Sequence, residues 1–341
     1  MTMKKNTISA LVLILIVSLS LLLTGCSGSG QGSDGQSSGN EQGSENNGGQ
    51  NSGNGSGSEN NGQNGGNSSG SENNGGQDSG NGSNTGNTAD KCEITAFSIG
   101  KADALLISSG DANILIDVGE EDDAEYICNG IKEKGINKLD IVVITHFDKD
   151  HVGGIAKILE EFDADKVIYP DYANTKDGYL AFRRAISDRG NEGKITETTE
   201  YSLGGLKLVV YPEADPDALR SKSNDFDNDM SLVCMLYYRD YRFLFAGDIE
   251  KDRTDEILDS GIEIECDWIK MPHHGRYNKK IKKLLDACVP SYAVVTDSDD
   301  MIADTDTLVE LQKRKAKIFS TRNGDVVTIA DENGISVSYA E

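Results

Sequence analysis

The sequence predicts an α/β domain over residues 91–341, built as two sheets covered by helices in an αββα sandwich. Residues 27–90 hold 20 of the chain's 38 glycines and almost no apolar side chain. Residues 91–341 hold 17 glycines, which is an ordinary frequency. Apolar runs typical of strands alternate there with helical patterns, in both halves. The length suffices for one domain with a complete core, and the composition excludes a collagen-like chain, a small disulfide scaffold and a polytopic membrane protein.

The first half of the domain alternates strands and helices. Residues 92–98 alternate apolar and polar side chains, and residues 139–145 form the continuous apolar run of a buried strand. The apolar positions of residues 122–134 recur at helical spacing, and Gly135 ends that helix. Further strands are expected at 104–109, 113–118 and 166–169, and further helices at 153–162 and 179–187.

The second half begins with two strands, 194–199 and 206–211, which we expect to pair with each other. A hairpin follows around Arg239-Asp240, and Asn333-Gly334 is a strong signal for a two-residue hairpin turn near the end. The hairpin strands are 231–238 and 242–246, the later strands 266–271, 292–296, 317–320, 326–330 and 335–339, and the helices 253–259, 278–288 and 308–313.

The domain is strongly acidic. The first 90 residues hold two lysines and seven acidic residues, which leaves 31 basic and 50 acidic residues and a formal charge of −19 in the domain. Such a surface excludes non-specific binding of nucleic acid over a broad face, so a polyanion would need a local patch or metal ions. The simplest interpretation is that the excess charge keeps an exported domain soluble.

The N-terminus has the pattern of an export signal. Lys4 and Lys5 precede the apolar run 8–23, which is short for a membrane span. The sequence Leu23-Thr24-Gly25-Cys26 resembles the lipobox of bacterial lipoproteins. That resemblance implies a signal peptide over 1–25, a lipid on Cys26, and a location on the outer face of the cytoplasmic membrane; the alternative is an uncleaved anchor.

Residues 26–90 are expected to form a disordered linker. Gly-Ser-Glu-Asn-Asn-Gly occurs three times, at Gly43, Gly57 and Gly70, and contains no apolar residue. Gly/Ser/Asn chains behave as flexible coils, so this length gives a mean reach of roughly 40–50 Å. The domain would then be tethered outside the membrane.

The histidines mark the candidate site. The chain has four histidines in two pairs, His146 with His151 and His273 with His274. Asp148 and Asp150 lie between the first pair, in a segment that follows a buried strand and precedes a helix. Two imidazoles and two carboxylates within six residues can converge on a cation, whereas a lone histidine is more often structural.

The segment 145–154, Thr-His-Phe-Asp-Lys-Asp-His-Val-Gly-Gly, resembles the metal-binding signature of the metallo-β-lactamase fold. The segments 115–119, 245–248 (Phe-Ala-Gly-Asp) and 270–275 (Lys-Met-Pro-His-His-Gly) agree with that fold in order. The subfamily that the chain is most similar to is the extracytoplasmic hydrolase domain of ComEC-type DNA-uptake proteins, which shares Asp at position 148. It also shares the segments 98–104 and 228–233.

The resemblance implies a ligand set for two divalent ions, Zn²⁺ or Mn²⁺. Asp150 and Asp248 would be the catalytic carboxylates, and Asp248 would bridge the two ions. The alternative for Asp248 is a structural role as the N-terminal cap of a helix. One of His273 and His274 would be a ligand and the other an orienting residue. The implied metal ligands are His146, Asp148, Asp150, His151, Asp248, His273 and His274.

The chain departs from the ComEC-type pattern in two places. Arg276 stands where a serine is usual, and 301–304 (Met-Ile-Ala-Asp) replaces an expected Gly-His-Pro. At these positions the resemblance does not support the substrate handling or turnover of the subfamily, and the loss of Gly-His-Pro favours a non-catalytic role. No transmembrane channel portion is evident, so we expect no DNA transport by this chain alone.

The segment 270–283 holds six basic residues and no acidic one. It either binds substrate phosphate, through Arg276, Lys279 and Lys280, or is the solvated face of the helix 278–288. With the two-metal pattern, it favours a phosphodiester substrate, DNA included, over a β-lactam.

Three functions therefore compete. The leading hypothesis is a membrane-tethered metal-dependent hydrolase of phosphodiesters, in which a metal-activated water attacks. The alternatives are a hydrolase of a small ester or lactone, and a non-catalytic metal-binding surface module. Five cysteines remain in the domain, four of them in apolar runs typical of core positions, and one disulfide is compatible with an oxidising exterior.

Overall fold

The computed structural model describes residues 90–340. The predicted signal peptide, the predicted lipidation site Cys26 and nearly all of the predicted linker lie outside these residues and stay predictions. Within 90–340 no helix is both long enough and apolar enough to cross a lipid bilayer.

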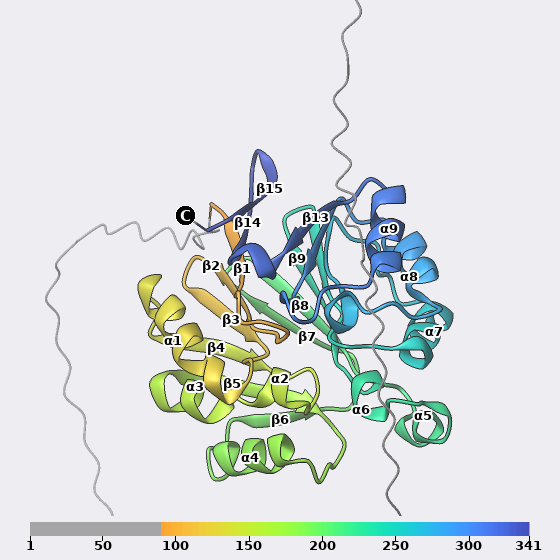
Figure 1. Cartoon of the computed structure of the whole chain (residues 1–341). Helices are drawn as coiled ribbons and strands as arrows, with labels where there is room; N and C mark the ends of the chain where they lie inside the picture. Colours follow the sequence, from red (N-terminus) through yellow and green to blue (C-terminus); the bar gives the residue numbers. More distant parts are fainter. Residues whose placement is uncertain (1–89, 341) are drawn as a thin grey trace, which may run out of the picture. The chain divides into compact units, whose positions relative to one another are not determined.

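Two sheets form the centre of the domain (Figure 1). The first has eight strands, in the order β15-β14-β1-β2-β3-β4-β5-β6, and the second has seven, in the order β13-β12-β11-β10-β9-β8-β7. The strands of the first sheet are β1 Cys92–Ala96, β2 Leu105–Ser109, β3 Ala112–Ile116, β4 Lys138–Val143, β5 Asp163–Pro170, β6 Glu192–Ile195, β14 Val326–Asp331 and β15 Gly334–Tyr339. Those of the second are β7 Thr199–Leu203, β8 Leu206–Tyr211, β9 Val233–Tyr238, β10 Tyr241–Phe245, β11 Trp268–Lys270, β12 Tyr292–Val295 and β13 Lys317–Ser320.

Helices cover the outer faces of both sheets. The helices of the first half are α1 Ala124–Glu133, α2 Lys149–Val152, α3 Ile155–Glu161 and α4 Asp177–Ile186. Those of the second half are α5 Pro216–Lys222, α6 Phe226–Asp229, α7 Lys251–Ser260, α8 Ile281–Cys288 and α9 Thr305–Lys313. α8 buries a stripe at helical spacing, Ile281, Leu284, Leu285 and Cys288, as the sequence predicts.

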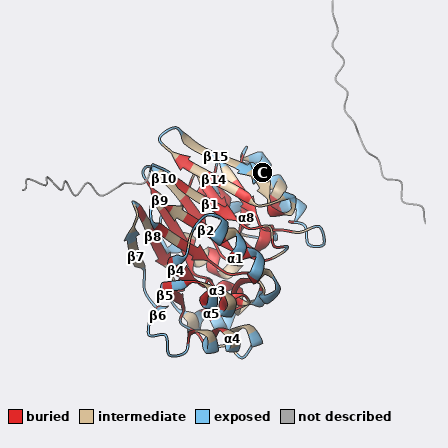
Figure 2. Ribbon diagram, turned by 90° about the vertical axis from the view of Figure 1, so that its left-hand side faces the viewer, coloured by how far each residue is buried: buried red, intermediate tan, exposed pale blue. Residues whose placement is uncertain are grey.

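Buried side chains form three layers that hold the sandwich together. Figure 2 shows buried residues along the strands of the sheets. The middle layer lies between the sheets and includes Ile94 and Ile114 from the first sheet and Phe243 and Trp268 from the second. The outer layers bury apolar side chains of α1, α3 and α4 on one side and of α7, α8 and α9 on the other. The predicted αββα sandwich is therefore confirmed.

The predicted pairing of 194–199 with 206–211 is wrong. β6 instead lies parallel to β5 at the edge of the first sheet, whereas β8 pairs with β7 and β9 in the second. The chain changes sheets between β6 and β7, and local patterns carry no information about such a crossing. The helix α5 is also absent from the prediction, although Asp215 caps it and Pro216 opens it, which is a readable start signal.

The five cysteines of the domain are buried and unpaired. The structure therefore contains no disulfide among residues 90–340, and these side chains serve as core residues.

Candidate metal centre

The candidate site lies where the carboxyl ends of neighbouring strands from both sheets meet. β3 and β4 run parallel in the first sheet, and β10 and β11 run parallel in the second, so residues that follow each pair share one edge. Asp117 follows β3, Asp248 follows β10, and the segment 272–275 follows β11. The loop before β2 joins them through two backbone bonds, from Asp103 N to Asp150 O and from Gly119 N to Asp103 O.

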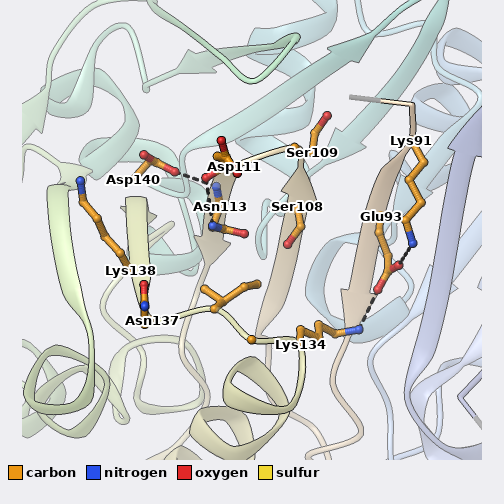
Figure 3. A pocket seen from close by; sticks show the side chains of 13 residues that line it. Lys91, Glu93, Ser108, Ser109, Asp111, Asn113, Lys134, Asn137, Lys138 and Asp140 are labelled. Atoms are coloured by element: carbon orange, nitrogen blue, oxygen red, sulfur yellow. Dashed lines mark hydrogen bonds and ion pairs between the residues drawn. The ribbon is translucent and has the colours of Figure 1, made fainter. Parts of the chain in front are cut away.

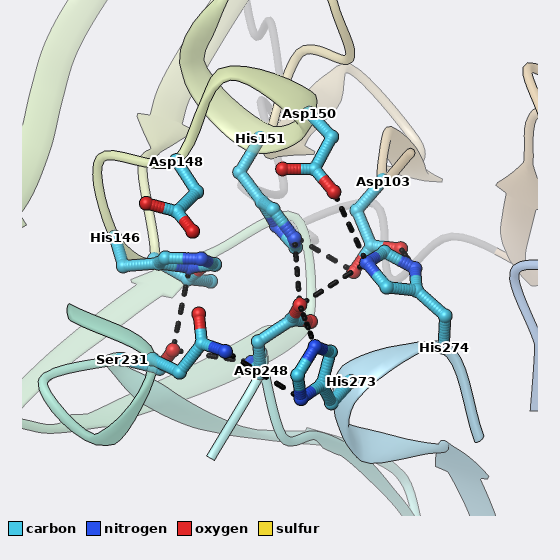
Figure 4. Close-up of polar contacts among 12 residues, drawn as sticks. Asp103, His146, Asp148, Asp150, His151, Ser231, Asp248, His273 and His274 are labelled. Carbon is cyan, nitrogen blue, oxygen red and sulfur yellow. Dashed lines mark hydrogen bonds and ion pairs between the residues drawn. The ribbon is translucent and has the colours of Figure 1, made fainter. Parts of the chain in front are cut away.

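Asp248 is the centre of the arrangement (Figure 4). Its Oδ2 atom lies 3.2 Å from His151 Nε2 and 3.1 Å from His274 Nε2. The carboxylate is almost completely buried. It therefore connects a histidine from the first sheet to a histidine from the second.

The two histidines that face Asp248 are oriented through their Nδ1 atoms. His151 Nδ1 lies 2.8 Å from Asp117 Oδ2, and that carboxylate also accepts bonds from the backbone and hydroxyl of Thr145. His274 Nδ1 lies 3.0 Å from the carbonyl oxygen of Thr296. In both cases Nδ1 is the donor, which turns Nε2 toward Asp248, as in metal sites whose histidines are held by outer partners.

Three buried nitrogen atoms in this region make no hydrogen bond of good geometry within residues 90–340: the Nε2 atoms of His146, His151 and His274. Those of His151 and His274 have ion-pair contacts with carboxylates instead, among them Asp248 Oδ2. Buried polar atoms without a hydrogen bond are rare, and here they lie among carboxylates. Donor atoms within 4.8 Å of one another form several sets, among them His146/His151/Asp248 and Asp150/His151/His274. This donor chemistry fits divalent cations.

The structure brings five of the seven predicted ligands together: His146, Asp150, His151, Asp248 and His274. Two stand apart. Asp148 forms an ion pair with Lys176 at 2.5 Å and belongs to none of the donor sets in the described part of the chain. His273 directs Nδ1 to Glu250 Oε1 at 2.8 Å, and its Nε2 lies 4.0 Å from Asp248. The geometry thus favours His274 as the ligand of the second pair.

Four charged residues of the site were not assigned a role from the sequence. They are Lys101, Asp103, Asp117 and Lys270. Asp117 and Asp103 lie in segments that carry the family resemblance, each close to a glycine with positive φ, Gly119 and Gly100. Their position in these segments, close to a glycine, is the sequence signal that indicates a role for Asp103 and Asp117. Lys270 was counted as part of the basic surface segment, but it is buried.

Lys270 balances the buried acidic charge. Its ammonium group forms ion pairs with Asp103 and with Asp248 Oδ1, the latter at 3.3 Å, and donates to the carbonyl of Gly247. Burial lowers the pKa of Lys270, but the two carboxylates outweigh burial and raise it. Burial likewise opposes ionisation of Asp248, yet His151, His274 and Lys270 hold its pKa well below the usual range.

The histidines of the site differ in protonation when no cation is bound. Burial, with the neighbouring His151, lowers the pKa of His146 well below its usual value. Burial also opposes protonation of His151, but Asp248, Asp117 and Asp103 raise its pKa well above that value. The raised pKa of His151 opposes cation binding at that ring, because a metal ligand must be the neutral imidazole.

The pH dependence of the metal-free fold follows from His274. Burial lowers the pKa of His274, but Asp248 and Asp103 overcome it and raise the pKa from 6.5 to about 9. A raised folded pKa stabilises the fold below pH 6.5, and this contribution is lost as the pH rises through about 9. We expect urea unfolding in EDTA to show a lower free energy of unfolding at pH 9 than at pH 6.5, and His274→Gln to reduce that difference. Greater stability at pH 9 would contradict this assignment.

A small hollow borders the donor cluster. Its volume is about 120 Å³, and its lining includes Lys101, His273, His274, Arg276 and the segment 301–304. Lys101 also reaches the cluster, since its ammonium lies 2.6 Å from Asp150 Oδ2. A larger hollow of about 650 Å³ lies at the opposite end of the first sheet, around Lys91, Lys134 and Asp140, and touches none of the donors (Figure 3).

The predicted phosphate-binding segment is only partly available. Lys280 forms an ion pair with Asp255 at 2.5 Å, and Lys270 faces the interior. Lys279 is exposed on the surface, and Arg276 lines the hollow beside the histidines. Of the three predicted phosphate contacts, Arg276 is therefore the one that lies next to the donor cluster.

Comparisons with known proteins agree with this fold. Residues 99–220 match the family model described as Metallo-beta-lactamase superfamily, a stretch that includes His146, Asp150 and His151 but ends before Asp248. ComE operon protein 3 of Bacillus subtilis is 24% identical over 166 residues, 48% of this chain and 20% of that protein. A beta-lactamase-like protein 2 homolog of Caenorhabditis elegans is 34% identical over 155 residues, 45% of each chain. The chain thus matches less than half the length of these relatives.

Two solved structures align with most of this chain. A metallo hydrolase from Ignicoccus hospitalis is 16% identical, with a TM-score of 0.45, and the alignment covers 74% of this chain and all of that chain. A metallo-beta-lactamase fold protein from Bacillus subtilis is 10% identical with the same TM-score and 73% of this chain covered.

Proposed function

Since this chain has the metallo-β-lactamase fold and matches that superfamily of metal-dependent hydrolases, we propose that it cleaves phosphodiesters, nucleic acid among them. The observation that carries the proposal is the buried histidine and carboxylate cluster bordered by two cationic side chains, Lys101 and Arg276. On a domain with a formal charge of −19, cations gathered at the mouth of a metal site favour an anionic substrate.

The residues that would hold the ions are His146, Asp150, His151, Asp248 and His274, and two ions, Zn²⁺ or Mn²⁺, suit this mixed nitrogen and oxygen set. Ions bound there supply a Lewis acid that activates water near neutral pH and stabilises charge on phosphoryl oxygens. The chain's own contribution is orientation and charge. Asp117 fixes the ring of His151, and Lys270 holds Asp248 Oδ1, which leaves Oδ2 facing the histidines.

Two cations are placed to bind the substrate. Lys101 lies between the donor cluster and the hollow, and Arg276 lies on the hollow's wall. Attraction of a phosphodiester to these side chains would bring the phosphorus atom to the cluster, since both border His274. The binding of a phosphate by Lys101 and Arg276 distinguishes this proposal from the ester or lactone alternative, because an uncharged ester needs no cation beside the donor cluster.

The decisive experiment is turnover by the full chain loaded with Mn²⁺ or Zn²⁺. The substrates are bis-p-nitrophenyl phosphate, single-stranded DNA and p-nitrophenyl acetate, with metal content measured alongside. Hydrolysis of the phosphodiesters supports the proposal. Turnover of the acetate alone favours the ester alternative, and binding of metal without any turnover favours a non-catalytic module.

We further propose that a lipid on Cys26 tethers the domain to the outer face of the cytoplasmic membrane. Leu23-Thr24-Gly25-Cys26 supports this, because the thiol of a cysteine at that position can form a thioether. Cys26→Ser should release the chain from the membrane fraction or leave the longer precursor, since a hydroxyl cannot form that bond. Fractionation with immunoblotting checks this, and unchanged membrane association with normal processing would rule lipidation out.

A further inference from the structure

The hollow beside the histidines has an unusual rim. Seven large apolar or aromatic side chains are exposed among residues 90–340, and two of them, Met301 and Ile302, line this hollow. Met301 is 49% exposed and Ile302 is 54% exposed. An apolar group of this kind next to a polar site marks a surface that contacts a ligand more often than a chance exposure does.

The rim is held in place. Asp304 N donates to Gly275 O at 3.2 Å, and Asp304 Oδ2 accepts from Tyr277 N at 2.8 Å. On the other side, Asp297 Oδ2 accepts from Ala303 N at 3.0 Å. Gly275 allows this approach, because a Cβ there would lie 2.7 Å from Ala303 Cβ. The segment 301–304 is therefore fixed against the histidine segment, and its apolar side chains form a preorganised wall.

The lining of the hollow contains both cationic and apolar side chains. Lys101 and Arg276 supply two cations, of which Lys101 also contacts Asp150 of the donor cluster. The volume of about 120 Å³ is well below the several hundred Å³ that hold a whole drug-sized ligand. The space therefore suits one group of a substrate, a phosphate or a single ring, with further contact made at the rim.

We propose that this hollow selects phosphodiesters that carry a flat apolar substituent, an aryl group or a nucleobase, with the phosphate held by Lys101 and Arg276 and the ring against Met301 and Ile302. This inference rests on the proposed phosphodiester chemistry and adds the substrate class. Aromatic and apolar side chains bind bases of any sequence through their faces, so the recognition is of a ring and not of a sequence.

The test is the affinity of two phosphonates that cannot be hydrolysed at the P–C bond, phenylphosphonate and methylphosphonate, measured by calorimetry on the Mn²⁺-loaded full chain. We expect phenylphosphonate to bind about tenfold more tightly, since burying part of a ring against apolar side chains has an effect of that order. In the double variant Met301→Ser/Ile302→Ser the preference should fall to within about twofold, with methylphosphonate affinity unchanged.

Two further variants separate the parts of the hollow. Arg276→Ser should weaken both phosphonates by a similar factor, and more at low salt, because it removes a charge and no apolar contact. Leu180→Ser, at an exposed apolar residue of α4, is the matched control and should change nothing. Equal affinity of the wild type for both phosphonates, or an unchanged preference in the double variant, would overturn the inference.

Failure of this inference and failure of the proposed function give different results. Hydrolysis of bis-p-nitrophenyl phosphate with no preference for phenylphosphonate overturns only the substrate class. A tenfold preference for phenylphosphonate without hydrolysis of any phosphodiester supports the ring-binding rim and overturns the hydrolase proposal.

Discussion

Asp248→Asn should lower phosphodiester hydrolysis by about 1,000-fold or more, a loss typical of removing a group that stabilises charge in a transition state. The side chain keeps its shape but loses the negative charge that faces His151 and His274. The same change should reduce the amount of Mn²⁺ or Zn²⁺ that copurifies, because a neutral amide is a poorer ligand for a divalent cation. Initial rates and elemental analysis on the same preparation measure both effects.

The matched control is Asp140→Asn, a change of the same chemistry at the opposite end of the first sheet. Asp140 accepts a hydrogen bond from Asn113 N and borders the larger hollow, far from the donors. It should leave rate and metal content unchanged. If Asp248→Asn keeps wild-type activity and metal content, Asp248 is not a metal ligand and the proposed role of the cluster is contradicted.

The parts of the site that the sequence predicted are those encoded within short segments. His146, Asp150 and His151 occupy one strand-to-helix turn, so their convergence follows from local structure. Asp148 belongs to the same turn but points to Lys176 instead. Its partner comes from the segment before α4, nearly thirty positions later, and no local pattern predicts that contact.

The charge balance of the site could not be predicted, because it joins residues from different sheets. Lys270 appeared to be one of six basic residues on a surface, yet β11 buries all three of its residues. Its partners Asp103 and Asp248 lie about 167 and 22 positions away, in a loop of the first sheet and after β10. An alternation of apolar and polar residues does not reveal that Lys270 is buried, since a strand that is buried on both faces has no polar side.

The fold shows the same division. The hairpin β9–β10 and the helix α8 were predicted because turn residues and apolar spacing encode them. The separation of β6 from β7 was not, because four residues of β6 contain only one buried side chain, Ile195. Such a short strand is specified by the neighbouring β5 and not by its own pattern.

Lys270→Met should destabilise the metal-free protein by about 3–5 kcal/mol, the effect of breaking a buried ion pair from one side. Lys270 is the cation between Asp103 and Asp248, and its removal leaves two buried carboxylates with less compensation. The exposed pair of Lys134 with Glu93 gives the control, since Lys134→Met should cost less than about 1 kcal/mol. Urea unfolding in EDTA measures both values.

The response of Lys270→Met to metal distinguishes charge balance from simple packing. Without the ammonium group, Asp103 and Asp248 attract a divalent cation more strongly, so Mn²⁺ should stabilise this variant more than it stabilises the wild type. If Lys270 only fills space, its replacement by methionine, which has a similar length, should leave the stabilisation by Mn²⁺ unchanged. Unfolding curves of both proteins over a series of Mn²⁺ concentrations measure this difference. If Mn²⁺ stabilises both proteins equally, or if the variant is as stable as the wild type in EDTA, Lys270 does not balance the charge of Asp248.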